Sequence, residues 1–89
     1  MSRWQVKFEP EAEDDLERLG EAATRRIIER LSWLESNFEA MTPLPLGYEW
    51  RGHFKFRVGD WRVIYRIDWE DNLIIIEAVD RRDRIYKKR

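Results

Sequence analysis

Two arginines are placed to face each other across a tight turn in the middle of the sequence. The stretch FKFRVGDWRVIY, residues 54–65, has the pattern of two strands joined by Gly59-Asp60, and a two-residue hairpin loop would set Arg57 directly opposite Arg62. Like charges facing each other in a sheet destabilise it by ~0.2–1 kcal/mol. Folding alone gives no reason for this pair, so we consider a bound anion as its counterpart.

Further side chains extend this cationic pair. Lys55 belongs to the same predicted face of the hairpin, and Arg82 and Tyr86 follow the last predicted strand. Guanidinium groups bind phosphate oxygens bidentately, and phosphoryl transfer needs mainly positioning and charge stabilisation. Several cations and one proton-transfer group would therefore suffice without a metal ion. The alternatives are a solvated basic face, or a cluster neutralised by Glu77 on the next strand.

Composition restricts the other kinds of chemistry. A chain of 89 residues with 43% hydrophobic composition supplies one modest core, so we expect a single domain, residues 1–89. The chain has no cysteine and one histidine, His53, so we expect no zinc site and no other cofactor. No apolar run is long enough for a signal peptide or a membrane span. We therefore expect a cytoplasmic protein without membrane contact.

The net charge of −1 is the sum of an acidic first half and a basic second half of the chain. Residues 1–50 carry 6 Lys and Arg against 11 Asp and Glu, whereas residues 51–89 carry 11 against 7. A polyanion would therefore meet the C-terminal half. Because the whole chain is slightly acidic, long-range steering towards nucleic acid is weak and binding has to be local.

Apolar periodicity predicts a strand, two helices and three further strands, in that order. Alternating Trp4, Val6 and Phe8 indicate the first strand, and Gly20 separates two helical stripes. The proline-rich stretch 39–50 is predicted to be an ordered crossing loop, held in part by Tyr48. The later strands are expected at about residues 52–58, 61–67 and 73–80, before a basic tail anchored by Ile85 and Tyr86.

This order predicts an α+β domain. A helical hairpin would pack on one face of a mostly antiparallel sheet, the last three strands would form a meander, and the other face would be exposed. The hairpin should turn through type II′ geometry, with Gly59 first. Expected partners on the apolar face are Val58 with Trp61, Phe56 with Val63 and Phe54 with Tyr65; on the other face they are Arg57 with Arg62, Lys55 with Ile64 and His53 with Arg66.

Three segments together resemble the RelE/ParE toxin superfamily of bacterial type II toxin–antitoxin systems. They are FEPEAEDDLERLG, PLGYEWRGHFKFRVGDWRVIYRI and IIIEAVDRRDRIY, and the strongest element is G-x-x-K-x-R-V-G-D-W-R-V-I-Y. The resemblance covers essentially the whole chain and implies the same α+β architecture. Three features differ from the RelE-type pattern: Asp80 replaces a frequent glycine, Arg81 replaces a frequent His or Lys, and the spacer before Tyr86 is short.

The resemblance also implies an activity. RelE-type members are endoribonucleases that cleave messenger RNA on the ribosome by attack of a 2′-hydroxyl on the adjacent phosphate, and a cognate antitoxin neutralises them. Their site would correspond here to Lys55, Arg57, Arg62, Arg82 and Tyr86. Two alternatives remain open: a ParE-like inhibitor of DNA gyrase without nuclease activity, and a degenerate member that only binds its antitoxin.

Aromatic residues offer a further route to RNA binding. Trp4, Trp33 and Trp61 are in phase with other apolar residues and are expected in the core. Trp69, in a predicted loop, is the one tryptophan that we retain as a possible contact with bases. We expect His53 to be a polar residue of the strand edge rather than a catalyst.

Overall fold

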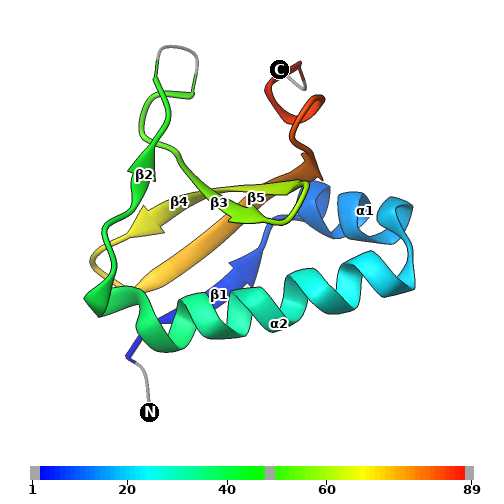
Figure 1. Ribbon diagram of the computed structural model, residues 1–89. Helices are drawn as coiled ribbons and strands as arrows, with labels where there is room; N and C mark the ends of the chain where they lie inside the picture. The colour runs from blue at the N-terminus through cyan, green and yellow to red at the C-terminus, as the bar shows by residue number, and fades with distance from the viewer. Residues whose placement is uncertain (1–2, 48–49, 88–89) are drawn as a thin grey trace.

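The computed structural model describes residues 3–47 and 50–87 and has the expected α+β architecture (Figure 1). The five-stranded sheet has the order β1-β5-β4-β3-β2, in which β1 is parallel to β5 and the other pairs are antiparallel. No helix among the described residues is long and apolar enough to cross a membrane. The elements are β1 (Gln5–Phe8), α1 (Pro10–Leu19), α2 (Glu21–Asn37), a 3₁₀ turn (Phe38–Ala40), β2 (Leu44–Pro45), β3 (Phe54–Val58), β4 (Trp61–Asp68), β5 (Leu73–Arg81) and a C-terminal 3₁₀ turn (Ile85–Lys87).

The boundaries of the two helices follow from their sequence. Pro10 occupies the first turn of α1, where its missing N–H is not needed, and Glu11 and Glu13 lie at the positive end of the helix dipole. Gly20 then separates α1 from α2 with φ 90° and ψ 168°, a conformation open essentially only to glycine. The helical hairpin predicted from the sequence is confirmed.

The main core lies between the helices and one face of the sheet. Figure 1 shows α1 and α2 on one side of the sheet and the C-terminal turn on the other. Ile27 and Leu34 of α2 and Val63 and Ile76 of the sheet are completely buried. Burial of each such side chain contributes about 1.5–3 kcal/mol, so this layer supplies most of the drive to fold.

Two carboxylates from the helices satisfy N–H groups that have no strand partner. Strand β1 pairs with β5 only as far as Ile76, so the edge of β5 beyond that residue is open. There Asp15 of α1, only 1% exposed, accepts a hydrogen bond of 2.8 Å from the backbone N–H of Val79. On the outer edge of β1, Glu35 of α2 accepts a bond of 2.7 Å from the N–H of Val6. Both helices are thus fastened to the sheet by polar contacts as well as by apolar packing.

The structure corrects four details of the sequence interpretation. The loop predicted at 39–50 contains a 3₁₀ turn and the short strand β2, and Tyr48 lies outside the described residues. Strand β3 begins at Phe54 rather than at residue 52. Trp33, expected in the core, is 42% exposed and stacks beside Phe56. The face opposite the helices is not fully exposed, because a second apolar cluster covers its centre: Ile64, Ala78 and Ile85, with Leu46 and Trp50 packed against them.

The Asp15 contact predicts a large effect of a single substitution. Asp15→Ala leaves the buried N–H of Val79 without a partner and should lower the free energy of unfolding by about 1–3 kcal/mol in urea denaturation. The matched control is Asp14→Ala on the exposed side of the same helix, which should change stability by less than about 0.5 kcal/mol. Equal stability of the two variants would contradict the proposed anchoring.

Tyr65 predicts a loss of stability at high pH. Its ring is completely buried, its hydroxyl has no hydrogen-bond partner among the described residues, and burial raises its pKa from 10.0 to about 12. Above pH 10 the unfolded chain loses this proton before the folded chain does. The free energy of unfolding should therefore fall between pH 10 and about 12, by up to about 2–3 kcal/mol.

Tyr65→Phe tests this directly in urea unfolding. At neutral pH the variant should be as stable as the parent or about 1 kcal/mol more stable, because it removes a buried hydroxyl that is not hydrogen-bonded. Between pH 10 and about 12, the free energy of unfolding of Tyr65→Phe should not show the fall that titration of Tyr65 causes in the parent. The control Tyr86→Phe changes an exposed ring and should follow the parent curve. Parallel curves for the parent and Tyr65→Phe would show that Tyr65 does not titrate with a raised pKa.

Candidate nucleic-acid interface

The β3–β4 hairpin has the register that its two-residue turn predicts. Arg57 lies opposite Arg62 and Lys55 opposite Ile64, while the apolar partners fall on the face towards the helices. Gly59 has φ 57°, and Asn72 is the only residue other than glycine with positive φ in the described part of the chain. Positive φ at the first central position alone is the requirement of a type II′ turn. The predicted register is therefore confirmed from Phe54 to Val58, whereas the predicted pairing of His53 with Arg66 does not form, because β3 begins only at Phe54.

Arg62 is held in place by the backbone of its own turn. Its Nη1 donates hydrogen bonds of 2.8 Å to the carbonyl oxygens of Gly59 and Trp61. These bonds use one of the three guanidinium nitrogens, so Nη2 and Nε keep their N–H groups for another acceptor. The guanidinium group is thus preorganised without being neutralised.

The other two hairpin cations lie on the same face. Arg57 is exposed and Lys55 is half-buried beside the short strand β2. Within residues 3–47 and 50–87, neither Lys55 nor Arg57 nor Arg62 forms an ion pair with a carboxylate. Asp80, however, is the β5 partner of Arg62, so one negative charge lies beside the cations. Its Oδ1 accepts a bond of 2.7 Å from the N–H of Arg81.

The C-terminal segment carries Arg82 and Tyr86 to this face. The N–H of Arg82 donates a bond of 2.9 Å to the carbonyl of Asp60, which ties the end of β5 to the hairpin turn. Ile85 is completely buried against Ile64, the strand partner of Lys55. The predicted anchoring by Ile85 is confirmed, whereas Tyr86 is 42% exposed and makes no hydrogen bond among the described residues. Lys55, Arg57 and Arg62 thus share one face by register, and the segment that carries Arg82 and Tyr86 is anchored to that face through Ile85.

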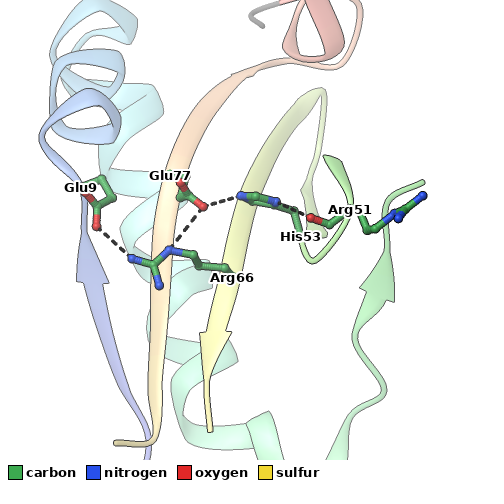
Figure 2. A network of polar contacts seen from close by, with 5 residues as sticks. All are labelled: Glu9, Arg51, His53, Arg66 and Glu77. Carbon is green, nitrogen blue, oxygen red and sulfur yellow. Dashed lines mark hydrogen bonds and ion pairs between the residues drawn. The ribbon is translucent and has the colours of Figure 1, made fainter. Parts of the chain in front are cut away.

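Glu77, considered as the counterion of the arginine pair, has different partners. Figure 2 shows that it contacts His53 and Arg66 instead. Arg66 bridges two carboxylates, with 3.5 Å from Nη2 to Glu9 and 3.5 Å from Nε to Glu77. A β-bulge explains the difference: Ile64 pairs with Ala78 but Tyr65 pairs with Ile76, so Glu77 is an extra residue turned to the face opposite the helices. The bulge directs this carboxylate away from Arg57 and Arg62.

His53 and Trp69 lie apart from the arginine pair. His53 Nε2 contacts Glu77 and Nδ1 lies 3.3 Å from the carbonyl oxygen of Arg51, so both ring nitrogens are engaged (Figure 2). This agrees with a polar structural role. Trp69 is 66% exposed and packs edge-on against Trp4, with 5.5 Å between the rings. It follows the end of β4 that is remote from the Gly59 turn, so a contact of Trp69 with bases stays a prediction.

With this geometry established, similarity to known proteins becomes informative. The family model described as the ParE toxin of the type II toxin–antitoxin system ParDE matches residues 6–86. The chain belongs to the ParE toxin family. The resemblance of the hairpin to the RelE/ParE superfamily is thereby confirmed.

Individual relatives of this ParE-family chain support the same conclusion. Toxin RelG from Mycobacterium tuberculosis is 32% identical over 83 residues, which cover 93% of this chain and 95% of RelG. A chain of the toxin–antitoxin complex RelBE2 from the same organism has a TM-score of 0.68 at 30% identity, covering 92% of this chain and 94% of that chain. A chain of the archaeal RelE–RelB complex from Pyrococcus horikoshii has a TM-score of 0.66 at 28% identity. This match covers 92% of the present chain and 98% of the archaeal one.

The second apolar cluster predicts that one side chain positions the C-terminal end. Ile85→Ala should release the turn that carries Tyr86 while the main core stays folded, because the cluster around Ile85 is separate from that core. Amide exchange should accelerate at Arg84 and Lys87, whose N–H groups bond within this segment. Ile85→Val, which keeps most of the contact, should leave exchange nearly unchanged. Unaltered exchange in Ile85→Ala would show that other contacts hold the turn.

Proposed function

We propose that residues 1–89 act as one toxin domain, an endoribonuclease that cleaves messenger RNA bound to the ribosome. The observation that carries this proposal is the Arg57–Arg62 pair. Two guanidinium groups are register partners on the sheet face away from the helices, and neither has a carboxylate ion-pair partner among the described residues. Like charges facing each other in a hairpin oppose folding and favour an anionic ligand, and Asp80 beside Arg62 places one negative charge against these two positive charges. In a chain of this toxin family, the ligand that fits is an RNA phosphodiester.

The proposed reaction uses a nucleophile supplied by the RNA itself. The 2′-oxygen of a ribose attacks the adjacent phosphorus, the bond from phosphorus to the 5′-oxygen breaks, and a 2′,3′-cyclic phosphate remains. Negative charge accumulates on the phosphoryl oxygens during this step. Arg57 and Arg62 would stabilise that charge, and Arg62 would do so with little reorganisation because the turn carbonyls already fix it.

Two protons must move in this reaction. One leaves the attacking 2′-hydroxyl, and another is delivered to the departing 5′-oxygen. Lys55 and Tyr86 are the proposed acid–base pair, since both side chains can transfer a proton and both come from segments on the cationic face. Arg82 would serve as a further contact to the phosphate or the leaving group. No metal ion is needed, because the cations supply the charge stabilisation.

The proposed partners are the ribosome with its messenger RNA and a cognate antitoxin. Both solved structures described above are complexes of a toxin with its partner, RelBE2 and the archaeal RelE–RelB complex. By analogy, an antitoxin would bind this chain and block its cationic face.

A second function remains a candidate because the matching family model is that of the ParE toxin. In that case the chain would inhibit DNA gyrase by binding the enzyme and would cut no nucleic acid. The acidic side chains of residues 1–50 favour this alternative, because they weaken attraction to RNA. Induced expression separates the two functions. Messages cut within translated codons support the nuclease, whereas a DNA-damage response with intact messages supports the gyrase inhibitor.

Two substitutions test the nuclease site. Arg62→Ala and Tyr86→Phe should each reduce cleavage of ribosome-bound messenger RNA by about 100-fold or more, because each removes a group used in the transition state. Cleavage is measured by primer extension on a purified translation system, and thermal unfolding verifies that each variant is folded.

The matched control is Arg25→Ala, which removes an exposed arginine paired with Glu21 on α2, away from the hairpin. It should cleave at the parental rate. If Arg62→Ala and Tyr86→Phe both cleave like the control, the assignment of the site is wrong. If the parent protein itself does not cleave, the nuclease function is wrong.

A further inference from the structure

The hairpin turn is also flanked by arginines on the side that faces the helices. A cavity of about 230 Å³ lies there, lined by Arg26 of α2, Gly59 and Asp60 of the turn, Trp61 of β4 and Arg81 of β5. Trp61 and Arg81 are partners across β4 and β5, and Trp61 packs against the main core. This cavity therefore lies on the opposite face of the hairpin from the Arg57–Arg62 pair. None of its residues belongs to the proposed catalytic set.

The guanidinium group of Arg26 lies close to Gly59 of the turn. A β-carbon placed on Gly59 would lie 3.6 Å from Nη2 and 3.9 Å from Cζ of Arg26. The guanidinium group is exposed and, among the described residues, has no ion-pair partner. In contrast, the preceding Arg25 is paired with Glu21 at 3.4 Å. Arg26 thus brings an uncompensated charge to the rim of the cavity.

Arg81 is the second cation and is held by an aromatic ring. Its Cζ lies 5.6 Å from the centroid of Trp61, within the range of a cation–π contact. Its Nε lies 3.8 Å from Asp83, a long and exposed ion pair. No contact of Nη1 or Nη2 occupies these nitrogens within the described part of the chain. Packing on Trp61 restricts the orientation of the guanidinium group, which lowers the entropy cost of binding a ligand.

Asp60 is the acidic side chain of the cavity wall, which thus carries two cations and one anion, while Asp83 lies outside the wall at the long ion-pair distance from Arg81. The lining has little apolar surface besides the ring of Trp61 and does not suit a peptide that docks by apolar side chains. Two guanidinium groups suit a phosphate, and the nearby carboxylate can accept a hydrogen bond from a ribose 2′-hydroxyl. This combination of groups is complementary to one nucleotide unit of an RNA backbone.

We propose that the Arg26–Arg81 cavity binds a backbone phosphate of an RNA strand that crosses the hairpin turn. A second phosphate of the same strand would lie at Arg57 and Arg62, on the other side of the two-residue turn. The choice of RNA as the ligand rests on the proposed nuclease function. A polyanion is favoured over an acidic peptide because regularly spaced charges can contact both faces of the turn.

Binding of a short fluorescein-labelled single-stranded RNA tests the proposal. Fluorescence anisotropy is measured over a range of salt concentrations in the Tyr86→Phe background, in which cleavage is expected to be strongly slowed. The double variant Arg26→Gln, Arg81→Gln should bind about tenfold more weakly, and the slope of log K against log salt should fall by about 1.4, as expected for two lost phosphate contacts on a single strand. Arg25→Gln is the matched control on the same helix and should leave affinity and slope unchanged.

A second assay separates this inference from the proposed function. In ribosome-dependent cleavage with Tyr86 intact, the double variant should raise KM and leave kcat unchanged, because it removes binding away from the reacting phosphate. RNA binding that depends on Arg26 and Arg81 in a protein that never cleaves would support the cavity and reject the nuclease.

Three outcomes would overturn the cavity proposal. They are parental affinity and slope in the double variant, absence of RNA binding by a protein that still cleaves on ribosomes, and a glutamate-rich peptide that binds at Arg26 and Arg81 in preference to RNA.

Discussion

The two-residue turn at Gly59-Asp60 is the constraint on which the site depends. Side chains alternate between the faces of a strand, so a change of register by one residue would reverse every side chain of the hairpin. The type II′ geometry, with φ 57° at Gly59, fixes this register. In this register the side chain of Val63 faces the helices, and Arg57 lies opposite Arg62. Core packing and the cationic pair therefore follow from one local conformation, which explains how a small domain maintains an unfavourable arrangement of charges.

Carboxylates of the acidic first half serve the fold rather than the cationic face. Asp15 and Glu35 accept hydrogen bonds from strand N–H groups at two edges of the sheet, and Glu9 contacts Arg66. Each of these acids is committed at a distance from the hairpin turn. The near-neutral total charge thus coexists with Arg57 and Arg62, which have no acidic ion-pair partner among the described residues. Asp80 is the exception beside Arg62, and it lowers the positive potential there.

Local sequence signals predicted much of this molecule. The apolar alternation, the proline and glycine positions and the two-residue turn each depend on residues close in the chain, so the helical hairpin and the β3–β4 register could be derived. The partners of Glu77 could not be derived, because a bulge in β5 has no local signal in this sequence and alters which face Glu77 joins. The exposure of Trp33 was missed because periodicity indicates a face of the helix but not where the sheet beneath it ends.

By itself, the sequence determined which residues carry the cations, which strands pair across the tight turn and which superfamily the chain resembles. Only the tertiary structure decided what surrounds those cations. Ile85 folds the C-terminal turn onto Ile64, and α2 brings Arg26 over Gly59, from positions far apart in the chain. Burial and edge hydrogen bonds set these contacts, and both depend on the packing of whole elements. The spacing of residues within one segment therefore determines which face of a strand or helix each side chain occupies. Which residues from other elements pack against that face is determined only when the whole chain has folded.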